Sequence, residues 1–317
     1  MANYAIADAH TDFLSTVYRQ PTVLTDGMEA QLNICLDSLQ KGNVRMEFFA
    51  AFVDGSRPRQ KNASLRCLEL IDCYHRMLET WGPENIVEVT KENIDSVIEN
   101  GPIGAVLTIE GGDVIHGKLG ALRMYRRMGV KVMGIIFNHA NEIGTSSAED
   151  PDTGLTSFGL ECIEEMNHLC MAVDVSHTNR GGFWDALKHS KQPIIATHSN
   201  AYGITPNARN LDDEQIRALI DTKGYMGMNF YTPFLTQAEE STLDDLMRHV
   251  EHVLALGGED ILGIGSDFDG LFGCPKELAG AQDYPKIIDR FVQAGYSETL
   301  IEKICHGNLV RYIKQFL

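Results

Sequence analysis

Two segments decide the fold: YAIADAHTD at residues 4–12 and IGAVLTIEGG at residues 103–112. Each contains a short apolar run of the kind found in buried strands, and each run ends in polar or charged side chains. The first segment ends in Asp8-Ala9-His10-Thr11-Asp12, and the second ends in Glu110 followed by two glycines. The same arrangement recurs along the chain. We therefore expect parallel strands with chemically active residues at their ends.

Short apolar runs alternate with segments of helical periodicity, a pattern typical of parallel βα units. The predicted strands are Tyr4–Ala7, Met46–Val53, Ile103–Ile109, Lys131–Phe137, Met171–Val175, Pro193–Thr197, Tyr225–Met228 and Ile261–Gly265. The predicted helices between them include Ser64–Glu79, Leu119–Arg127, Leu211–Asp221 and Leu243–Leu256. Eight strands with intervening helices favour an α/β fold, a closed (β/α)₈ TIM barrel, over an open doubly wound sheet.

Residues 1–317 are interpreted as a single barrel domain. The chain is 44% hydrophobic and has no low-complexity run, repeat or linker-like stretch, and α/β barrels of this length commonly form one domain. The segment 18–41 is interpreted as an insertion after the first strand. The segment 283–317 is expected to supply helices that close the barrel.

The formal net charge of −17 argues against a nucleic-acid partner and against an anionic membrane surface. No stretch approaches the roughly 18–20 apolar residues of a membrane span, and the amino terminus lacks the features of a signal peptide. The seven cysteines are odd in number and contain no CxxC pair, which favours buried free thiols in a reducing compartment. These features predict a cytoplasmic enzyme that does not act on membranes.

Residues suited to metal binding follow five of the predicted strands. In a closed barrel the carboxyl ends of all strands meet on one face, where active sites are built. Imidazole and carboxylate groups suit Zn²⁺ and, less selectively, Mn²⁺ or Co²⁺. The residues are His10, Asp12, Glu110, His177, His198 and Asp267. His10 and Asp12 are two apart on an extended segment, so their side chains point the same way and can meet one ion.

Each of these residues taken alone has a structural explanation, because a lone aspartate before a turn usually caps it and a lone histidine is usually just a satisfied polar group. Their coincidence at five strand ends favours a metal site. The remaining histidines are not assigned as ligands. Among them, His249 and His252 are expected on a solvated helix face.

Ten segments carry a resemblance to a known family in their order and spacing, nearly from end to end of the chain. They are DAHTD, IEGG, LGALRMYRRMGVKVM, DVSH, PIIATHSNAYG, NARNLDD, MGMNFY, GIGSDFDG, DYPKIIDRFVQAGYSE and GNLVRY. Together they resemble the renal (membrane) dipeptidase family, peptidase family M19 of the amidohydrolase superfamily. Any one of these segments is a weak signal, but the ordered set is highly specific.

The resemblance implies a metallo-dipeptidase with two divalent ions, of which zinc is favoured, and a dipeptide as substrate. His10 and Asp12 would bind one ion, and His177 and His198 the other. Glu110 would bridge the two ions. A homodimer is also implied, because members of the family often form one.

The resemblance also implies roles for residues beyond the metal ligands. Asp267 corresponds to the family's proton-handling carboxylate. Arg209 corresponds to the arginine that receives the terminal carboxylate of the substrate, and Tyr231 to a tyrosine that lines the site. These roles are chemically sound: two cations about 3.5–4 Å apart can hold a bridging hydroxide, a nearby carboxylate can transfer protons, and arginine binds carboxylates through paired hydrogen bonds.

One segment departs from the family pattern. After the fourth predicted strand, well-studied members carry a histidine that contacts the oxygen of the scissile group, whereas this chain reads Phe137-Asn138-His139. Either Asn138 or His139 could supply the missing donor, whose loss would cost about 10²–10³ in rate. Alternatively, the same site acts on another amide, an N-acyl amino acid or a lactam. A third reading is a barrel that has lost catalysis and only binds.

Overall fold

The computed structural model describes residues 4–25, 32–55, 62–150 and 152–317. Nine parallel strands form its sheet. They are β1 Ile6–Thr11, β2 Val44–Phe52, β3 Ile86–Glu88, β4 Ile103–Glu110, β5 Val132–Gly134, β6 Ala172–Asp174, β7 Ile195–Ala196, β8 Tyr225–Met228 and β9 Leu262–Ile264. Each of the eight predicted strands overlaps one of these, and β3 is the addition.

Eight of the strands close into a ring. The order runs β2-β1-β9-β8-β7-β6-β5-β4, and β2 pairs with β4 to complete the circle. On its other edge β4 pairs with β3 through Ile103–Ala105 and with β5 through Thr108–Glu110, so β3 lies outside the ring. The prediction of a (β/α)₈ barrel is confirmed.

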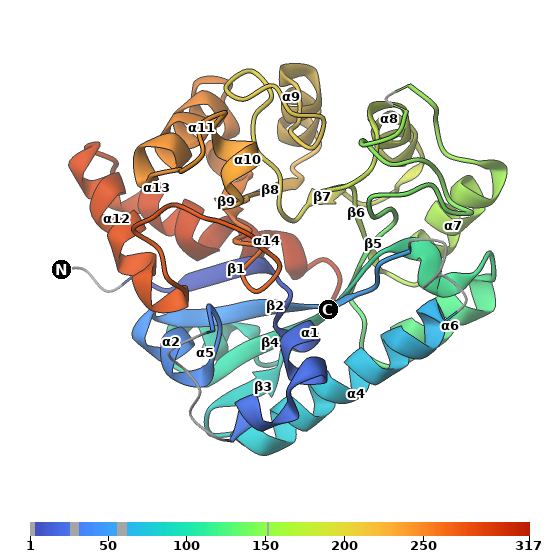
Figure 1. The fold of residues 1–317 in the computed structure, drawn as a ribbon, viewed down its shortest axis with the longest axis horizontal. Helices are drawn as coiled ribbons and strands as arrows, with labels where there is room; N and C mark the ends of the chain where they lie inside the picture. The colour runs from blue at the N-terminus through green and yellow to red at the C-terminus, as the bar shows by residue number, and fades with distance from the viewer. Residues whose placement is uncertain (1–3, 26–31, 56–61, 151) are drawn as a thin grey trace.

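Helices surround the ring (Figure 1). They are α1 Phe13–Arg19, α2 Leu36–Lys41, α4 Ala63–Trp81, α5 Ile94–Glu99, α6 Leu119–Arg127, α7 Ser157–His168, α8 Arg180–His189, α9 Asp213–Asp221, α10 Thr232–Leu235, α11 Leu243–Ala255, α12 Tyr284–Gln293, α13 Glu298–Glu302 and α14 Asn308–Ile313. The described part of the segment 18–41 holds the end of α1, a 3₁₀ turn at Pro21–Leu24, and α2. None of the helices in the described ranges is long and apolar enough to cross a membrane.

The barrel interior is apolar away from the strand ends. Small and large side chains alternate there, with Ala7 and Ala9 of β1 beside Phe48 of β2. Tyr312 and Phe316, in and just after α14, pack into the same cluster and so close this end of the barrel. Burial of each large side chain contributes about 1.5–3 kcal/mol. The polar strand ends are therefore held on a rigid frame.

The side chain of His249 departs from the sequence-based expectation. His249 on α11 is fully buried rather than solvated. Its Nδ1 accepts a hydrogen bond from the Ala201 amide at 3.1 Å, and its Nε2 lies 3.0 Å from the Leu235 carbonyl. The helical periodicity placed His249 and His252 together, but only His252 reaches the surface, where it pairs with Asp213 at 2.7 Å.

The cysteines agree with the expectation in part. All seven lie in described residues and none forms a disulfide. Five are buried, Cys274 is half-buried, and Cys170 is exposed.

Candidate active site

The predicted metal ligands converge at the carboxyl ends of the strands. His10 lies in β1 and Asp12 follows that strand directly, while Glu110 is the last residue of β4. His177, His198 and Asp267 lie just beyond β6, β7 and β9. The apolar sequence of each strand explains this placement. Each apolar run ends at the rim of the barrel, so the polar residues that follow it lie in the space above the rim.

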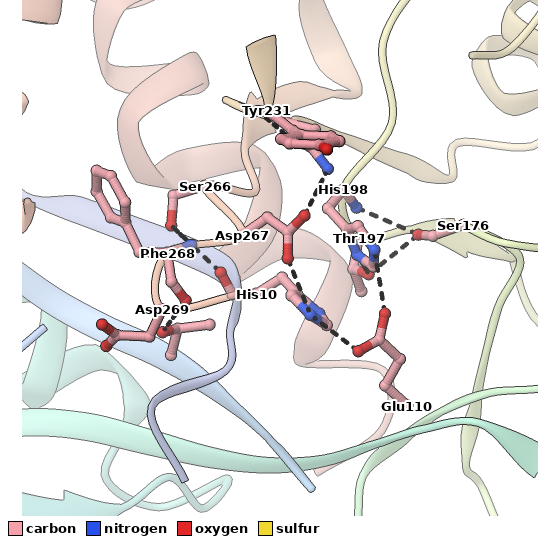
Figure 2. Close-up of polar contacts among 12 residues, drawn as sticks. His10, Glu110, Ser176, Thr197, His198, Tyr231, Ser266, Asp267, Phe268 and Asp269 are labelled. Carbon is pink, nitrogen blue, oxygen red and sulfur yellow. Dashed lines mark hydrogen bonds and ion pairs between the residues drawn. The ribbon is translucent and has the colours of Figure 1, made fainter. Parts of the chain in front are cut away.

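The carboxylate of Glu110 is the centre of the cluster. Its Oε1 lies 2.8 Å from His177 Nε2 and 3.3 Å from His198 Nε2. Its Oε2 lies 3.5 Å from His10 Nε2. Figure 2 shows His10 and His198 turned towards this carboxylate. One carboxylate thus faces three imidazoles with its two oxygens.

Ligand atoms gather in two sets that share Glu110. His10, Asp12 and Glu110 form one set, and Glu110, His177 and His198 form the other, with the atoms of each set within 4.8 Å of one another. This is the division expected for a bridging glutamate between two ions. A third set, of His10, His198 and Asp267, overlaps both.

A hydrogen-bond chain fixes the tautomer of His198. Thr197 Oγ1 lies 2.7 Å from Asp174 Oδ2 and 2.8 Å from His198 Nδ1. The single hydroxyl proton of Thr197 goes to the Asp174 carboxylate, so its oxygen accepts from Nδ1–H of His198. The lone pair of His198 Nε2 is therefore left facing Glu110. Outer hydrogen bonds of this kind orient metal-binding histidines.

The side chain of Asn138 does the same for His177. Its Oδ1 lies 3.1 Å from His177 Nδ1 and accepts the ring proton. The two Nε2 atoms of His177 and His198 consequently face each other at 3.0 Å. Two lone pairs at this distance are unfavourable unless a cation lies beside them, so the imidazoles fit divalent metal ions.

Two further atoms fit the same interpretation. His10 Nε2 and Asp12 Oδ1 are buried and have no hydrogen-bond partner in the described structure. Buried polar atoms are rarely left unsatisfied, and those that are call for a ligand or ion. Burial and the charge of Arg209 lower the pKa of His177 to about 4, which keeps that imidazole in its neutral, metal-binding form.

Asp267 occupies an uncommon backbone conformation at the edge of the cluster. Its φ is 64°, in the left-handed region that non-glycine residues rarely adopt and that is often found at functional sites. Its Oδ1 lies 3.8 Å from His10 Nε2 (Figure 2). Its Oδ2 accepts a hydrogen bond from Asn229 Nδ2 at 3.0 Å. Burial, reinforced by the charge of Glu110 and opposed by that of His10, raises the pKa of Asp267 to about 6.

Three residues of the site are not assigned by the sequence: Asp174, Thr197 and Asn229. Each lies within or directly after a strand, one to three residues before an assigned residue. Their position at the strand ends could have marked them as candidate site residues. Their hydrogen-bonding roles could not be predicted, because their partners lie on neighbouring strands and the sequence of one strand does not show which side chains it meets.

Arg209 lies beside the metal ligands and is 7% exposed. Its Nη2 donates to the His198 carbonyl at 3.3 Å, whereas Nε and Nη1 have no hydrogen-bond partner in the described part of the chain. Burial lowers the pKa of Arg209 to about 10. The guanidinium therefore stays charged at neutral pH with two donor atoms unused.

The structure separates the two candidates for the missing donor. Asn138 lines a cavity of about 340 Å³ above the cluster, together with Tyr231 and Asp267. His139 does not line this cavity. It is half exposed, and its Nδ1 lies 3.5 Å from Glu149 Oε1.

A (β/α)₈ barrel with this ligand set at its carboxyl-terminal face defines the class of the protein, a metal-dependent hydrolase. Comparison with known proteins gives the family. The model of the membrane dipeptidase family, peptidase family M19, matches residues 1–316. The chain belongs to this family, and it is a metallopeptidase of the dipeptidase type.

Relatives and solved structures agree. An uncharacterized protein of Klebsiella pneumoniae is 35% identical over 232 residues, 70% of this chain and 85% of that protein. An uncharacterized dipeptidase of Schizosaccharomyces pombe is 29% identical, over 98% of this chain and 80% of its own length.

Two crystal structures share the fold closely. A family M19 metallopeptidase named dipeptidase AC has a TM-score of 0.93 at 29% identity, over 99% of both chains. A metallopeptidase from Rhodobacter sphaeroides, liganded with a phosphinate mimic of the dipeptide L-Ala-D-Ala, has a TM-score of 0.91 at 27% identity, over 99% of both chains.

Proposed function

We propose that this chain hydrolyses the peptide bond of dipeptides that carry a free C-terminal carboxylate, at a centre of two divalent ions, preferably zinc. The position of Glu110 between two sets of ligands carries this proposal. The partners of His177 and His198 support it, because each leaves Nε2 unprotonated and directed at Glu110.

The metal ions would be held by His10 and Asp12 on one side and by His177 and His198 on the other, with Glu110 shared. When bound, two such ions polarise a carbonyl and lower the pKa of water. Asp267 takes the proton from the attacking water and passes it to the leaving amine. Asn229 holds Oδ2 of Asp267, so that Oδ1 remains directed at the cluster.

Arg209 receives the C-terminal carboxylate of the substrate. Two of its nitrogen atoms are buried with no hydrogen-bond partner among the described residues, and a carboxylate would accept from both. A guanidinium is expensive to bury unpaired, so the substrate supplies the missing partner. Tyr231, on the wall of the same cavity, bounds the space that the substrate occupies.

Asn138 replaces the substrate-contacting histidine of the family. Because its Oδ1 accepts from His177, its amino group is the part left to donate to an oxygen in the cavity. An amide donor at this position stabilises negative charge on the oxygen as the peptide bond breaks.

The protein is further proposed to be a cytoplasmic homodimer. The seven cysteines without a disulfide support a reducing compartment. The dimer rests on family resemblance, and light scattering of the purified protein tests it.

Metal analysis and an assay of one sample test the function. The protein is purified without chelator, its metal content per chain is measured, and L-L and L-D dipeptides are compared with their C-terminal amides. About two ions per chain with cleavage of free dipeptides but not of amides is expected. Two ions without dipeptide cleavage would move the activity to another amide, an N-acyl amino acid or a lactam. Absence of bound metal after refolding with Zn²⁺ would refute the site.

A further inference from the structure

A second cavity of about 590 Å³ adjoins the active site. Its wall is formed mainly by α1 and the start of α4, which lie side by side (Figure 1). Ser15, Arg19 and Phe52 line both this cavity and the one above the metal ligands. The two spaces therefore meet at these three residues.

The second cavity contains polar groups without partners. The side chain of Arg66 makes no hydrogen bond or ion pair with any described residue, and its Nη1 is buried. Its guanidinium is held in place against the ring of Tyr18, with Cζ 3.3 Å from the ring centroid. Ser15 is 2% exposed, and its Oγ also lacks a hydrogen-bond partner in the described ranges. All of these groups can donate hydrogen bonds.

The charge of the whole protein makes the lack of a described partner for the Arg66 guanidinium unusual. The chain carries a net charge of −17, so acidic partners are abundant. The guanidinium of Arg19, which is exposed, also makes no hydrogen bond or ion pair with the described residues, and its charge acts on Asp269. Asp54 and Glu69 line the same cavity, but Asp54 has an interaction of its own and neither carboxylate forms an ion pair with Arg66. Arg66 Nη1 and Ser15 Oγ are buried donors without a partner among the described residues, so they call for an acceptor, and the charges of Arg66 and Arg19 favour an anionic one.

The location of the cavity indicates which part of a substrate reaches it. Arg209 lies on the His198 side of the cluster. The shared wall lies on the Asp12 side, where the Ser15 amide donates to the Asp12 carbonyl at 2.8 Å. A dipeptide whose carboxylate is held by Arg209 and whose scissile carbonyl lies at the cluster therefore directs its amino-terminal residue towards the second cavity.

We propose that this cavity is a subsite for an acidic side chain on the amino-terminal residue of the substrate, with Arg66 and Arg19 as its cationic groups and Ser15 as a neutral donor. The inference rests on the proposed dipeptidase function, because it uses the orientation that Arg209 gives the substrate. It predicts a preference for L-glutamyl over L-glutaminyl dipeptides, two side chains of nearly equal size that differ in charge.

The kcat/KM values of the metal-loaded enzyme for L-Glu-L-Ala and L-Gln-L-Ala test the subsite. A charge-assisted hydrogen bond contributes about 1.5–3 kcal/mol, so the wild type should prefer the glutamyl substrate by about 10- to 100-fold. Arg66→Gln should bring the ratio of the two kcat/KM values to within about 2-fold of unity. Arg66→Lys should give an intermediate ratio, because lysine keeps the positive charge but lacks the paired N–H donors of the guanidinium. Arg76→Gln, on the same helix but outside the cavity, is the control and should keep the wild-type ratio.

Binding of the free amino acids separates failure of the subsite from failure of the function. L-Glutamate should bind the metal-loaded wild type at least about 10-fold more tightly than L-glutamine, and Arg66→Gln should remove the difference. Cleavage of L-Ala-L-Ala without a glutamyl preference in either measurement would overturn the subsite and leave the dipeptidase intact. Tighter glutamate binding that depends on Arg66, without cleavage of any dipeptide, would keep the subsite and overturn the dipeptidase. Circular dichroism and metal content confirm that each variant is folded.

Discussion

Asn229 Nδ2 lies 3.0 Å from Oδ2 of Asp267 and donates a hydrogen bond to it. Asn229 is itself held by Asn200, whose Oδ1 accepts from the Asn229 amide at 3.0 Å and whose Nδ2 donates to the Asn229 carbonyl at 2.9 Å. The carboxylate thought to move protons is therefore fixed by a buried amide pair rather than by a charged partner. It keeps one oxygen free to exchange a proton.

Replacement of Asp267 by asparagine should abolish proton transfer and leave metal binding in place. The amide keeps the shape of the carboxylate but is not basic, so kcat should fall by about 10²–10⁴. Metal content per chain should equal that of the wild type. Full activity in Asp267→Asn would refute the role assigned to this residue.

Asn138→Ala and His139→Ala should differ sharply in metal affinity and in kcat. Loss of Asn138 removes the acceptor that orients His177, so metal affinity should weaken by about 10- to 100-fold, and kcat should fall even at saturating metal. His139 faces Glu149 at the surface, so its loss should change neither quantity by more than about 2-fold. Metal titration measures the metal affinity of each variant, and steady-state kinetics measure its kcat. The opposite order of effects would assign the donor to His139.

Gly270 is a position where no side chain fits. A Cβ atom there would lie 2.2 Å from Asp12 Oδ2 and 3.0 Å from Asp267 Oδ1. Gly270→Ala should therefore displace the Asp12 carboxylate, lowering bound metal from about two ions to about one and reducing activity by at least about 10²-fold. Gly120→Ala on α6 is the control, because its nearest neighbour would be 3.9 Å away. Unchanged metal content in Gly270→Ala would count against Asp12 as a ligand.

Acid should destabilise the protein in part through His249. Burial lowers the pKa of this imidazole to about 4, compared with about 6.5 in the unfolded chain. Below pH 6.5 the unfolded state binds a proton that the folded state does not, so the stability from neutral His249 is complete above pH 6.5 and is lost as the pH falls towards 4.

Urea unfolding of the wild type and His249→Gln, in chelator to remove metal effects, measures this contribution. His249→Gln should be less stable at pH 7.5, because it loses the hydrogen bonds to Ala201 and Leu235. The difference between the two proteins should narrow by about 2 kcal/mol at pH 5. A difference independent of pH would show that His249 titrates normally in the fold.

The sequence by itself determined the strands, several helices and the group of candidate metal-binding residues. Strand and helix periodicities are local, so the apolar runs located eight strands, and Leu119–Arg127 and Tyr225–Met228 were predicted with the bounds observed. The end of a strand is also a local feature. Because parallel strands all end on one face of a barrel, the residues after each run could be assigned to one site before any contact was known.

Tertiary structure alone decided what depends on contacts between distant strands. Closure of the ring requires the β2–β4 and β1–β9 pairings, which no local pattern encodes. The contact of Asn138, rather than His139, with His177 follows from the path of one loop, and burial of His249 follows from the loops packed on α11. Residues close together in the sequence therefore differ in their contacts, and only the packed chain determines which contact each of them makes.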